Sequence, residues 1–253
     1  MKILAICGSP KKGNTYSALN FIKDKYPEID FKILMLKDVS LQPCLGCYVC
    51  VKLGEEKCPL KDDREKIVKE MMEADGVLFS SPVYTMMITS LMKNFFERVG
   101  YIDHRPIFYG KHAMLMAVCA GFGADEANEY MGGMCSIFGF SIASSVELKV
   151  ASKSKNEKEY NNKLTAEAFE SFVQTIKENQ GRAPSISLTQ LIYYNVFRTL
   201  SQLQKDAYKA DYKFYKEKTD VPGNAKVNVF KKMFANFMTG RIIKNMMKNR
   251  WCE

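Results

Sequence analysis

The stretch Lys2-Ile-Leu-Ala-Ile-Cys7, with the loop Gly8-Ser-Pro-Lys-Lys-Gly-Asn-Thr15 that follows it, decides the fold of this chain. A continuous apolar run of this length, ended by glycine and proline, is typical of a strand covered on both faces. Thr15 then opens a helical stretch to about Lys25, so the loop joins a buried strand to the N-terminus of a helix. This order predicts a parallel sheet with helices on both faces.

The same alternation recurs along the first 180 residues. We expect further uniformly apolar strands near 31–36, 75–80, 112–120 and 141–150, separated by helical patterns, with a long helix near 157–179. Five such strands suit the doubly wound, flavodoxin-like order 2-1-3-4-5, in which a ligand binds at the carboxyl ends of strands one, three and four. In this chain those three strands end in unusual loops.

Beyond Gly181 the pattern is helical only, over 188–218 and, after a break at Val221-Pro-Gly223, in a final helix to about Arg250. We therefore divide the chain into an α/β flavodoxin-like domain, 1–180, with a cysteine-rich insertion at 40–60, and an all-helical extension, 181–253. The net charge of +9 lies in the extension, which has 14 basic and 5 acidic residues, whereas residues 1–180 have 23 of each. A basic tail is typical of an anionic membrane or nucleic-acid partner, or of helices with a solvated face.

The final helix contains an apolar stripe interleaved with lysine and arginine. Its members are Val229, Phe230, Met233, Phe234, Phe237, Ile242, Ile243, Met246 and Met247. A stripe of this kind can lie on an anionic membrane, or it can cover the core or a neighbouring subunit with its lysines in water. We favour the second interpretation, and we expect neither a nucleic-acid partner nor membrane association.

Overall composition excludes several classes of protein. With 47% apolar and 26% charged residues, the chain can build a sizeable core and is not a disordered chain. It lacks a run of the ~18 apolar residues that a membrane-spanning helix needs, and we expect a cytoplasmic protein. Eight cysteines are too sparse for a disulfide scaffold. Cys7, Cys119 and Cys135 read as buried, and Cys252 lies at the terminus.

The first loop offers hydrogen-bond donors for an anion. It matches neither the Walker pattern nor the Gly-x-Gly-x-x-Gly dinucleotide turn. Instead Ser9, Asn14 and Thr15 supply hydroxyl and amide groups beside a helix N-terminus, which suits a dianionic monoester phosphate such as that of flavin mononucleotide (FMN). The competing interpretation is a plain helix start, capped by Thr15 after a turn at Gly13.

Together with Ser81-Pro-Val-Tyr84 and Met92-Lys-x-Phe-Phe-x-Arg98, this loop resembles the NADPH-dependent FMN reductase family. With Pro43-Cys-Leu-Gly-Cys-Tyr-Val-Cys50 ahead of Cys58 and Asp62-Asp63, the sequence is more closely similar to the iron–sulfur flavoprotein branch of that family. The resemblance covers about residues 1–180.

The resemblance also implies a flavin site. The phosphate is expected to be held by Ser9, Lys11, Asn14 and Thr15. The isoalloxazine ring is expected to be bordered by Pro82, Val83, Tyr84 and Thr85. The third loop, which matches the family mainly by position, is expected to contribute Ala120, Gly121 and Gly123 to the flavin site. We interpret Met86, Met87, Ile88 and Met92 as core residues. Because a flavin performs its own redox chemistry, we assign no catalytic acid or base, and we interpret His104 and His112 as surface or core histidines.

Four cysteines lie on one connection, Cys44-x2-Cys47-x2-Cys50-x7-Cys58. Three equal steps let a short curled loop direct its sulfurs at one centre, as in bacterial ferredoxins, and Cys58-Pro59 repeats the Cys-Pro end of those runs. Structural zinc sites more often use two separated pairs. The spacing thus favours a [4Fe–4S] cluster, with no metal and zinc as the alternatives, and Cys58 is the least secure ligand because a charged stretch precedes it.

From these observations we expect an FMN-dependent oxidoreductase that transfers hydride or electrons between NAD(P)H, or a redox partner, and an acceptor. The resemblance implies a homodimer or homotetramer with the flavin near a subunit interface. Two alternatives stay open: an electron-carrier flavoprotein without a small-molecule substrate of its own, and a flavodoxin-like scaffold whose basic tail binds nucleic acid or membrane. The sequence identifies neither the acceptor nor the preferred donor.

Overall fold

A computed structural model describes residues 1–152 and 154–248 of the chain. Its five strands form one parallel sheet in the order β2-β1-β3-β4-β5, as predicted. The strands are β1 (Lys2–Cys7), β2 (Asp30–Met35), β3 (Gly76–Pro82), β4 (His112–Cys119) and β5 (Ser141–Lys149). All eight residues of β4 are buried, because this strand lies between β3 and β5 and is covered on both faces, whereas the edge strands β2 and β5 keep exposed residues.

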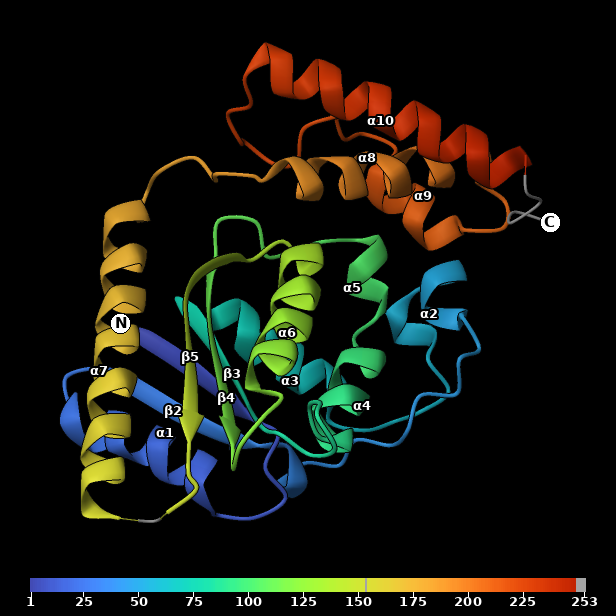
Figure 1. Cartoon of the computed structure of the whole chain (residues 1–253). Coiled ribbons are helices and arrows are strands. Elements are labelled where there is room, and N and C mark those ends of the chain that lie inside the picture. Colours follow the sequence, from blue (N-terminus) through green and yellow to red (C-terminus); the bar gives the residue numbers. More distant parts are fainter. Residues whose placement is uncertain (153, 249–253) are drawn as a thin grey trace.

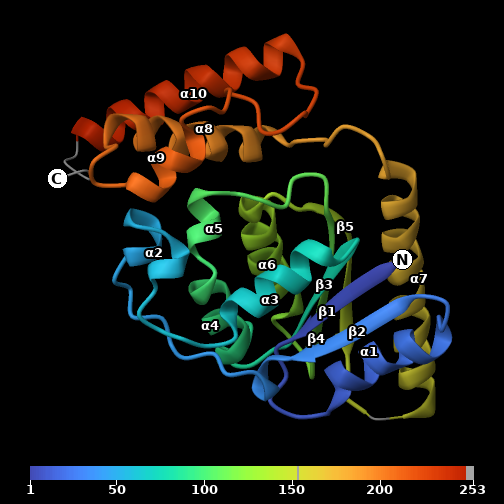
Figure 2. The same ribbon diagram turned by 180° about the vertical axis from the view of Figure 1, so that it is seen from behind.

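Helices cover both faces of the sheet (Figures 1 and 2). The helices of the described residues are α1 (Asn14–Lys25), α2 (Val49–Lys52), α3 (Arg64–Glu73), α4 (Ser90–Arg98), α5 (Tyr101–His104), α6 (Ala124–Phe138), α7 (Lys155–Asn179), α8 (Leu188–Leu203), α9 (Lys209–Tyr215) and α10 (Val229–Lys248), with short 3₁₀ turns η1 (Leu36–Asp38) and η2 (Glu55–Lys57). Leu19 and Ile22 of α1 pack with Phe169 and Phe172 of α7 on one face. The opposite face packs against α3, α4 and α6.

The extension α8–α10 lies beyond the amino ends of the strands, and the arrowheads of β4 and β5 point away from it (Figure 1). Gln190 of α8 fixes this position, since its Nε2 donates to the carbonyl of Ser136, at 3.1 Å, and to that of Phe140, at 2.9 Å, immediately before β5. The extension therefore covers the amino edge of the sheet and leaves the carboxyl edge free.

One helix prediction for the extension was wrong. The spacing predicted continuous helix over 188–218, but the chain leaves the helix after Leu203 and α9 begins only at Lys209. The break folds α9 back, so that Tyr215 becomes fully buried with its ring centroid 5.2 Å from that of Tyr194. A straight helix would have left this tyrosine without that contact.

The apolar stripe of α10 covers its neighbours only in part. Ala235, Thr239 and Ile243 are buried, and the helix packs on α8 through Ala235 and Leu191. The larger side chains of the stripe remain exposed: Val229, Phe230, Met233, Phe234, Phe237 and Met247. Within one copy of the chain, the helix therefore buries Ala235, Thr239 and Ile243, of which only Ile243 belongs to the stripe. Arg250 and Cys252 lie outside the described residues.

Candidate functional site

Three loops meet at the carboxyl edge of the sheet because β1, β3 and β4 are neighbours. The Gly8 amide donates to the Ser80 carbonyl at 2.8 Å, and the Thr89 hydroxyl donates to the Gly8 carbonyl at 2.7 Å. The Thr89 amide in turn donates to the Ser81 hydroxyl at 3.1 Å. These bonds join the first two loops into one rigid surface.

The first loop presents its donors around the start of α1. Ser9 and Thr15 are buried, whereas Lys11 and Asn14 are exposed, and the Ser9 hydroxyl donates to the Lys11 carbonyl at 2.7 Å. The helix begins at Asn14 after Gly13, and among the described residues no side chain caps it. Amides of the first turn of a helix have no partner within the helix, so they remain able to bind an anion.

This geometry bears on the two interpretations of the loop. A helix cap places its residue before the first turn, but Thr15 lies inside α1 and makes no capping bond. The plain helix start with Thr15 as its cap is therefore wrong. Ser9, Lys11, Asn14 and Thr15 lie on the loop and the first turn that include these uncapped amides, and their donor chemistry fits the phosphate of FMN.

The second loop contains a strained turn. The Tyr84 amide donates to the Met87 carbonyl at 2.8 Å and the Met87 amide donates back at 3.1 Å. Between them Thr85 and Met86 have φ values of 51° and 64°, a conformation that costs non-glycine residues about 1–3 kcal/mol each. Such strain is concentrated at functional sites, and it projects this turn outward from Pro82 and Val83.

Two methionines of this turn correct the sequence interpretation. Ile88 and Met92 are buried core residues, as expected, but Met86 and Met87 are exposed, together with Tyr84. The tight turn prevents Met86 and Met87 from reaching the core. They form an apolar surface beside Gly123 of the third loop instead, which is the kind of surface that a flat cofactor ring needs.

The third loop packs against the second. Gly123 has φ +89°, and a Cβ there would come within 2.9 Å of both the Met86 Cα and the Val83 Cγ1. Only glycine allows this approach. Ala120 and Gly121 are exposed on the same edge, and Phe122 is 83% exposed. The residues proposed from the sequence for the flavin therefore lie on three contiguous loops, with apolar side chains open to a ligand.

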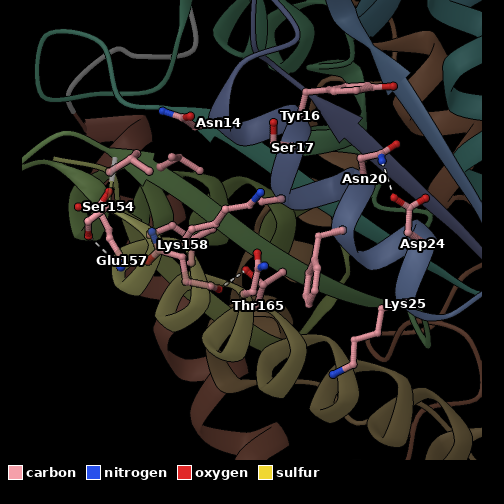
Figure 3. Close-up of a pocket in the computed structure, with 17 residues that line it drawn as sticks. Asn14, Tyr16, Ser17, Asn20, Asp24, Lys25, Ser154, Glu157, Lys158 and Thr165 are labelled. Carbon is pink, nitrogen blue, oxygen red and sulfur yellow. Dashed lines mark hydrogen bonds between the residues drawn. The ribbon is translucent and has the colours of Figure 1, made fainter. Parts of the chain in front are cut away.

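A hollow of about 830 Å³ borders this edge between α1 and α7 (Figure 3). It begins at Asn14, passes Ser17 and Ser154, and reaches Lys25. Its walls do not include Ser9 or residues 82–85. The hollow is thus a neighbour of the first loop and not the surface that the three loops form together.

The cysteine segment is closed at its neck by two adjacent aspartates. Asp63 accepts from the Ser40 amide at 2.9 Å, and Asp62 accepts from the Gln42 amide at 3.0 Å. Arg98 of α4 binds both oxygens of Asp62, at 2.8 and 2.9 Å. The arginine of the Met92–Arg98 motif therefore fixes the base of this segment.

The four cysteines lie at different depths. Cys44 and Cys47 are exposed, Cys50 on α2 is half-buried, and Cys58 is buried. Among the described residues, no three cysteine, histidine or acidic side chains form a ready metal site. Cys58, predicted from the sequence to be the least secure ligand, is the most buried of the four.

Buried arginines make the surroundings of these thiols positive. Arg98 Nη1 donates to the Cys58 Sγ at 3.5 Å, while Arg64, also buried, leaves its Nε and Nη1 without a hydrogen-bond partner among the described residues. Burial by itself would raise the pKa of the Cys58 thiol, but the bond from Arg98, the Leu60 amide and the charge of Arg64 outweigh it and lower that pKa. Burial raises the pKa of the Cys50 thiol. A buried arginine that donates to a thiol, and a second whose Nε and Nη1 have no partner among the described residues, fit an anionic thiolate-bound cluster.

One pair near this segment was not visible in the sequence. The Nδ1 of His104 lies 2.8 Å from the Oδ2 of Asp211, which is 107 residues away in the sequence. His112 is buried at the start of β4, and burial lowers its pKa. No pattern of spacing could have joined α5 to α9, because only the break after α8 turns α9 back toward the core.

Comparison with known proteins places this geometry in a family. The family model for NADPH-dependent FMN reductase matches residues 1–155. An iron–sulfur flavoprotein of Archaeoglobus fulgidus is 29% identical over 235 residues, covering 86% of this chain and 99% of that protein. Another, from Methanocaldococcus jannaschii, is 41% identical over 103 residues, covering 39% of this chain and 51% of that protein.

Solved structures show the same fold. The structure of RosB with bound 8-demethyl-8-formylriboflavin-5'-phosphate has a TM-score of 0.60 at 16% identity and covers 90% of this chain and 92% of its own. A flavone reductase has a TM-score of 0.57 at 13% identity, covering 90% and 100%. Both matches necessarily reach into the extension.

No helix among the described residues is long and apolar enough to cross a membrane.

Proposed function

The chain belongs to the NADPH-dependent FMN reductase family, and from that premise we propose that its three loops bind FMN at the carboxyl edge of the sheet. The observation that supports this site most is the uncapped start of α1 beside Ser9 and Thr15, joined by hydrogen bonds to the strained second loop. The protein is an oxidoreductase of this family.

The residues would divide the binding of FMN between them. Ser9, Asn14, Thr15 and the first-turn amides would hold the phosphate, with Lys11 adding positive charge. Pro82, Val83, Tyr84 and Thr85 would border the ring, and Ala120, Gly121 and Gly123 would complete the edge. When bound, FMN supplies hydride and single-electron chemistry, and the protein supplies position and charge.

We further propose that NAD(P)H or a redox partner delivers the electrons on the open side of this surface. Tyr84 and Phe122 are both exposed there, and aromatic side chains offer a flat surface to a planar ring. The sequence relatives named iron–sulfur flavoproteins, and the arginines beside the thiols, support a [4Fe–4S] cluster on Cys44, Cys47, Cys50 and Cys58. We also propose a homodimer or homotetramer.

One experiment tests these proposals together. The chain would be purified anaerobically, titrated with FMN, analysed for iron and sulfide, and assayed for NAD(P)H oxidation with a quinone or a dye as acceptor. Bound FMN with steady-state turnover supports the reductase. Bound FMN without turnover indicates an electron carrier, and a folded protein that takes up no FMN contradicts the flavin site.

A further inference from the structure

The C-terminal extension makes a buried ionic contact with the domain that contains the cysteines. Asp211 of α9 is buried, and its carboxylate binds two consecutive residues at the end of α5. One oxygen lies 2.8 Å from the Nδ1 of His104, and the other accepts a hydrogen bond from the Nη1 of Arg105. Tyr215, also of α9, donates its hydroxyl to the His104 carbonyl at 2.6 Å. The extension is therefore anchored at this point.

Arg105 connects this contact with α9 to the cysteine segment. Its Nη2 donates to the carbonyl of Cys50 at 2.9 Å and to the Oε2 of Glu55 at 2.7 Å. The guanidinium is buried and lies 5.3 Å from the centroid of the Tyr101 ring, so it has little freedom to turn. Residues of α9 also contact α2, the short helix that includes Cys50.

The charges explain why Asp211 matters. Three arginines, Arg64, Arg98 and Arg105, are buried around the segment, and Asp62 already neutralises Arg98. Glu55 can neutralise Arg105 only from a side chain that is 41% exposed, where water screens the interaction. Asp211 gives Arg105 a buried partner, and removal of one member of a buried pair leaves an uncompensated charge.

We propose that the extension clamps the cysteine segment, and that Asp211 is the positioning residue that holds Arg105 against the Cys50 carbonyl. The function of this clamp rests on the proposed cluster, because a centre bound by four thiols needs Cys50 to be held in place relative to Cys58. Without the Asp211 carboxylate, the Arg105 guanidinium would lose its buried partner and keep only the exposed Glu55, so its bond to the Cys50 carbonyl would weaken and α2 would loosen.

The test compares Asp211→Asn with Asp220→Asn. Asp220 is a matched control, because it is an acidic residue of the extension that binds Lys232, at 2.9 Å, and Asn236, at 3.2 Å, instead of the α5 end. The first readout uses protein without metal: iodoacetamide alkylation of Cys50, followed site by site by mass spectrometry. Cys135, fully buried in the core, serves as an internal reporter of global opening.

In Asp211→Asn we expect Cys50 to be alkylated about ten-fold faster with Cys135 unchanged, because local opening costs less than global unfolding. After anaerobic reconstitution, the same variant should lose iron to a chelator faster than wild type and give an altered EPR signal when reduced. Asp220→Asn should behave as wild type in each measurement. Asp211→Glu, which keeps the carboxylate, should restore slow alkylation and provides a variant if Asp211→Asn does not fold.

Equal alkylation of Cys50 in Asp211→Asn and wild type overturns the clamp, as does an equal acceleration in Asp220→Asn. A parallel rise at Cys135 shows general destabilisation and also overturns it. If wild type takes up no iron, the proposed cluster fails, but the alkylation measurement still decides the clamp.

Discussion

At the scale of single residues, the hydroxyls of Ser9 and Thr15 are the groups on which the proposed phosphate site depends most. Both side chains are buried beside the uncapped start of α1. Each charge-assisted hydrogen bond contributes about 1.5–3 kcal/mol, so Ser9→Ala with Thr15→Ala should weaken FMN binding by about ten-fold or much more. A fluorescence titration measures this. Thr175→Ala, at a half-buried threonine of α7 whose hydroxyl donates only to the Ser171 carbonyl of the same helix, is the control. Unchanged affinity in a folded double variant contradicts the phosphate assignment.

Asp103 on α5 gives a pH dependence that can be measured. Its Oδ1 is buried without a hydrogen-bond partner among the described residues, and burial raises its pKa from 3.8 to about 6, against the opposing charges of His104 and Lys93. The folded protein then binds this proton more tightly than the unfolded chain does. The contribution of Asp103 to the free energy of unfolding is therefore lost as the pH rises from about 4 to about 6.

Asp103→Asn should remove this loss. We expect the free energy of unfolding at pH 7 to rise by about 1–3 kcal/mol in the variant, with little change near pH 4. Urea unfolding at both pH values measures the difference. Asp75→Asn is the control for the same substitution at a carboxylate that is not buried. The Asp75 carboxylate accepts a hydrogen bond from the Lys2 amide at an exposed position. If the free energies of unfolding of Asp103→Asn and wild type differ by the same amount at both pH values, the raised pKa assigned to Asp103 is wrong.

At the scale of elements, the cysteine segment can be tested separately from the flavin loops. Cys47 is exposed on the segment and lies on none of the three loops. Cys47→Ser should therefore abolish the broad visible absorption of thiolate-bound iron and leave the FMN affinity as in wild type. Anaerobic spectra with iron and sulfide analysis check both. Zinc, or no metal, in anaerobically prepared wild type would refute the cluster, whereas loss of FMN binding in the variant would show that the two sites are not separate.

Most elements could be predicted because local pattern and tertiary role agree. The buried strands are uniformly apolar, and β1 was predicted from Lys2 to Cys7 as observed. The break between α8 and α9 could not be predicted, because the helical spacing of the tyrosines continues across it. The pair of His104 and Asp211 depends on that break and was missed for the same reason. Exposure of Met86 follows from a strained backbone that composition does not reveal.

At the scale of the whole molecule, the two edges of the sheet are covered by different parts of the chain. The three loops proposed to bind FMN lie at the carboxyl edge, and the extension covers the amino edge (Figures 1 and 2). The cysteine segment begins after η1, beyond the carboxyl end of β2, and reaches α9 at α2. It is the connection between the two ends. Changes confined to α10 should for this reason leave FMN binding intact.

The exposed stripe of α10 provides the last prediction. Phe230 and Phe237 are 81% and 58% exposed, and an apolar surface of this kind marks an interaction site. Two of the lysines interleaved with the stripe are already engaged within the chain, Lys231 with the Ile186 carbonyl and Lys232 with Asp220. They are thus less able to bind lipid phosphate, which favours a second copy of the chain as the partner over an anionic membrane.

Phe230→Ser with Phe237→Ser should therefore shift the protein toward smaller oligomers in sedimentation velocity, because burial of apolar area contributes about 25 cal/mol per Å². FMN affinity should not change, since neither side chain lies near the carboxyl edge. Lys244→Ser, at an exposed position of the same helix, is the control for a general effect on α10. If the double variant keeps its oligomeric state but no longer binds anionic liposomes that wild type binds, the stripe is a membrane surface and the interpretation given for it is wrong.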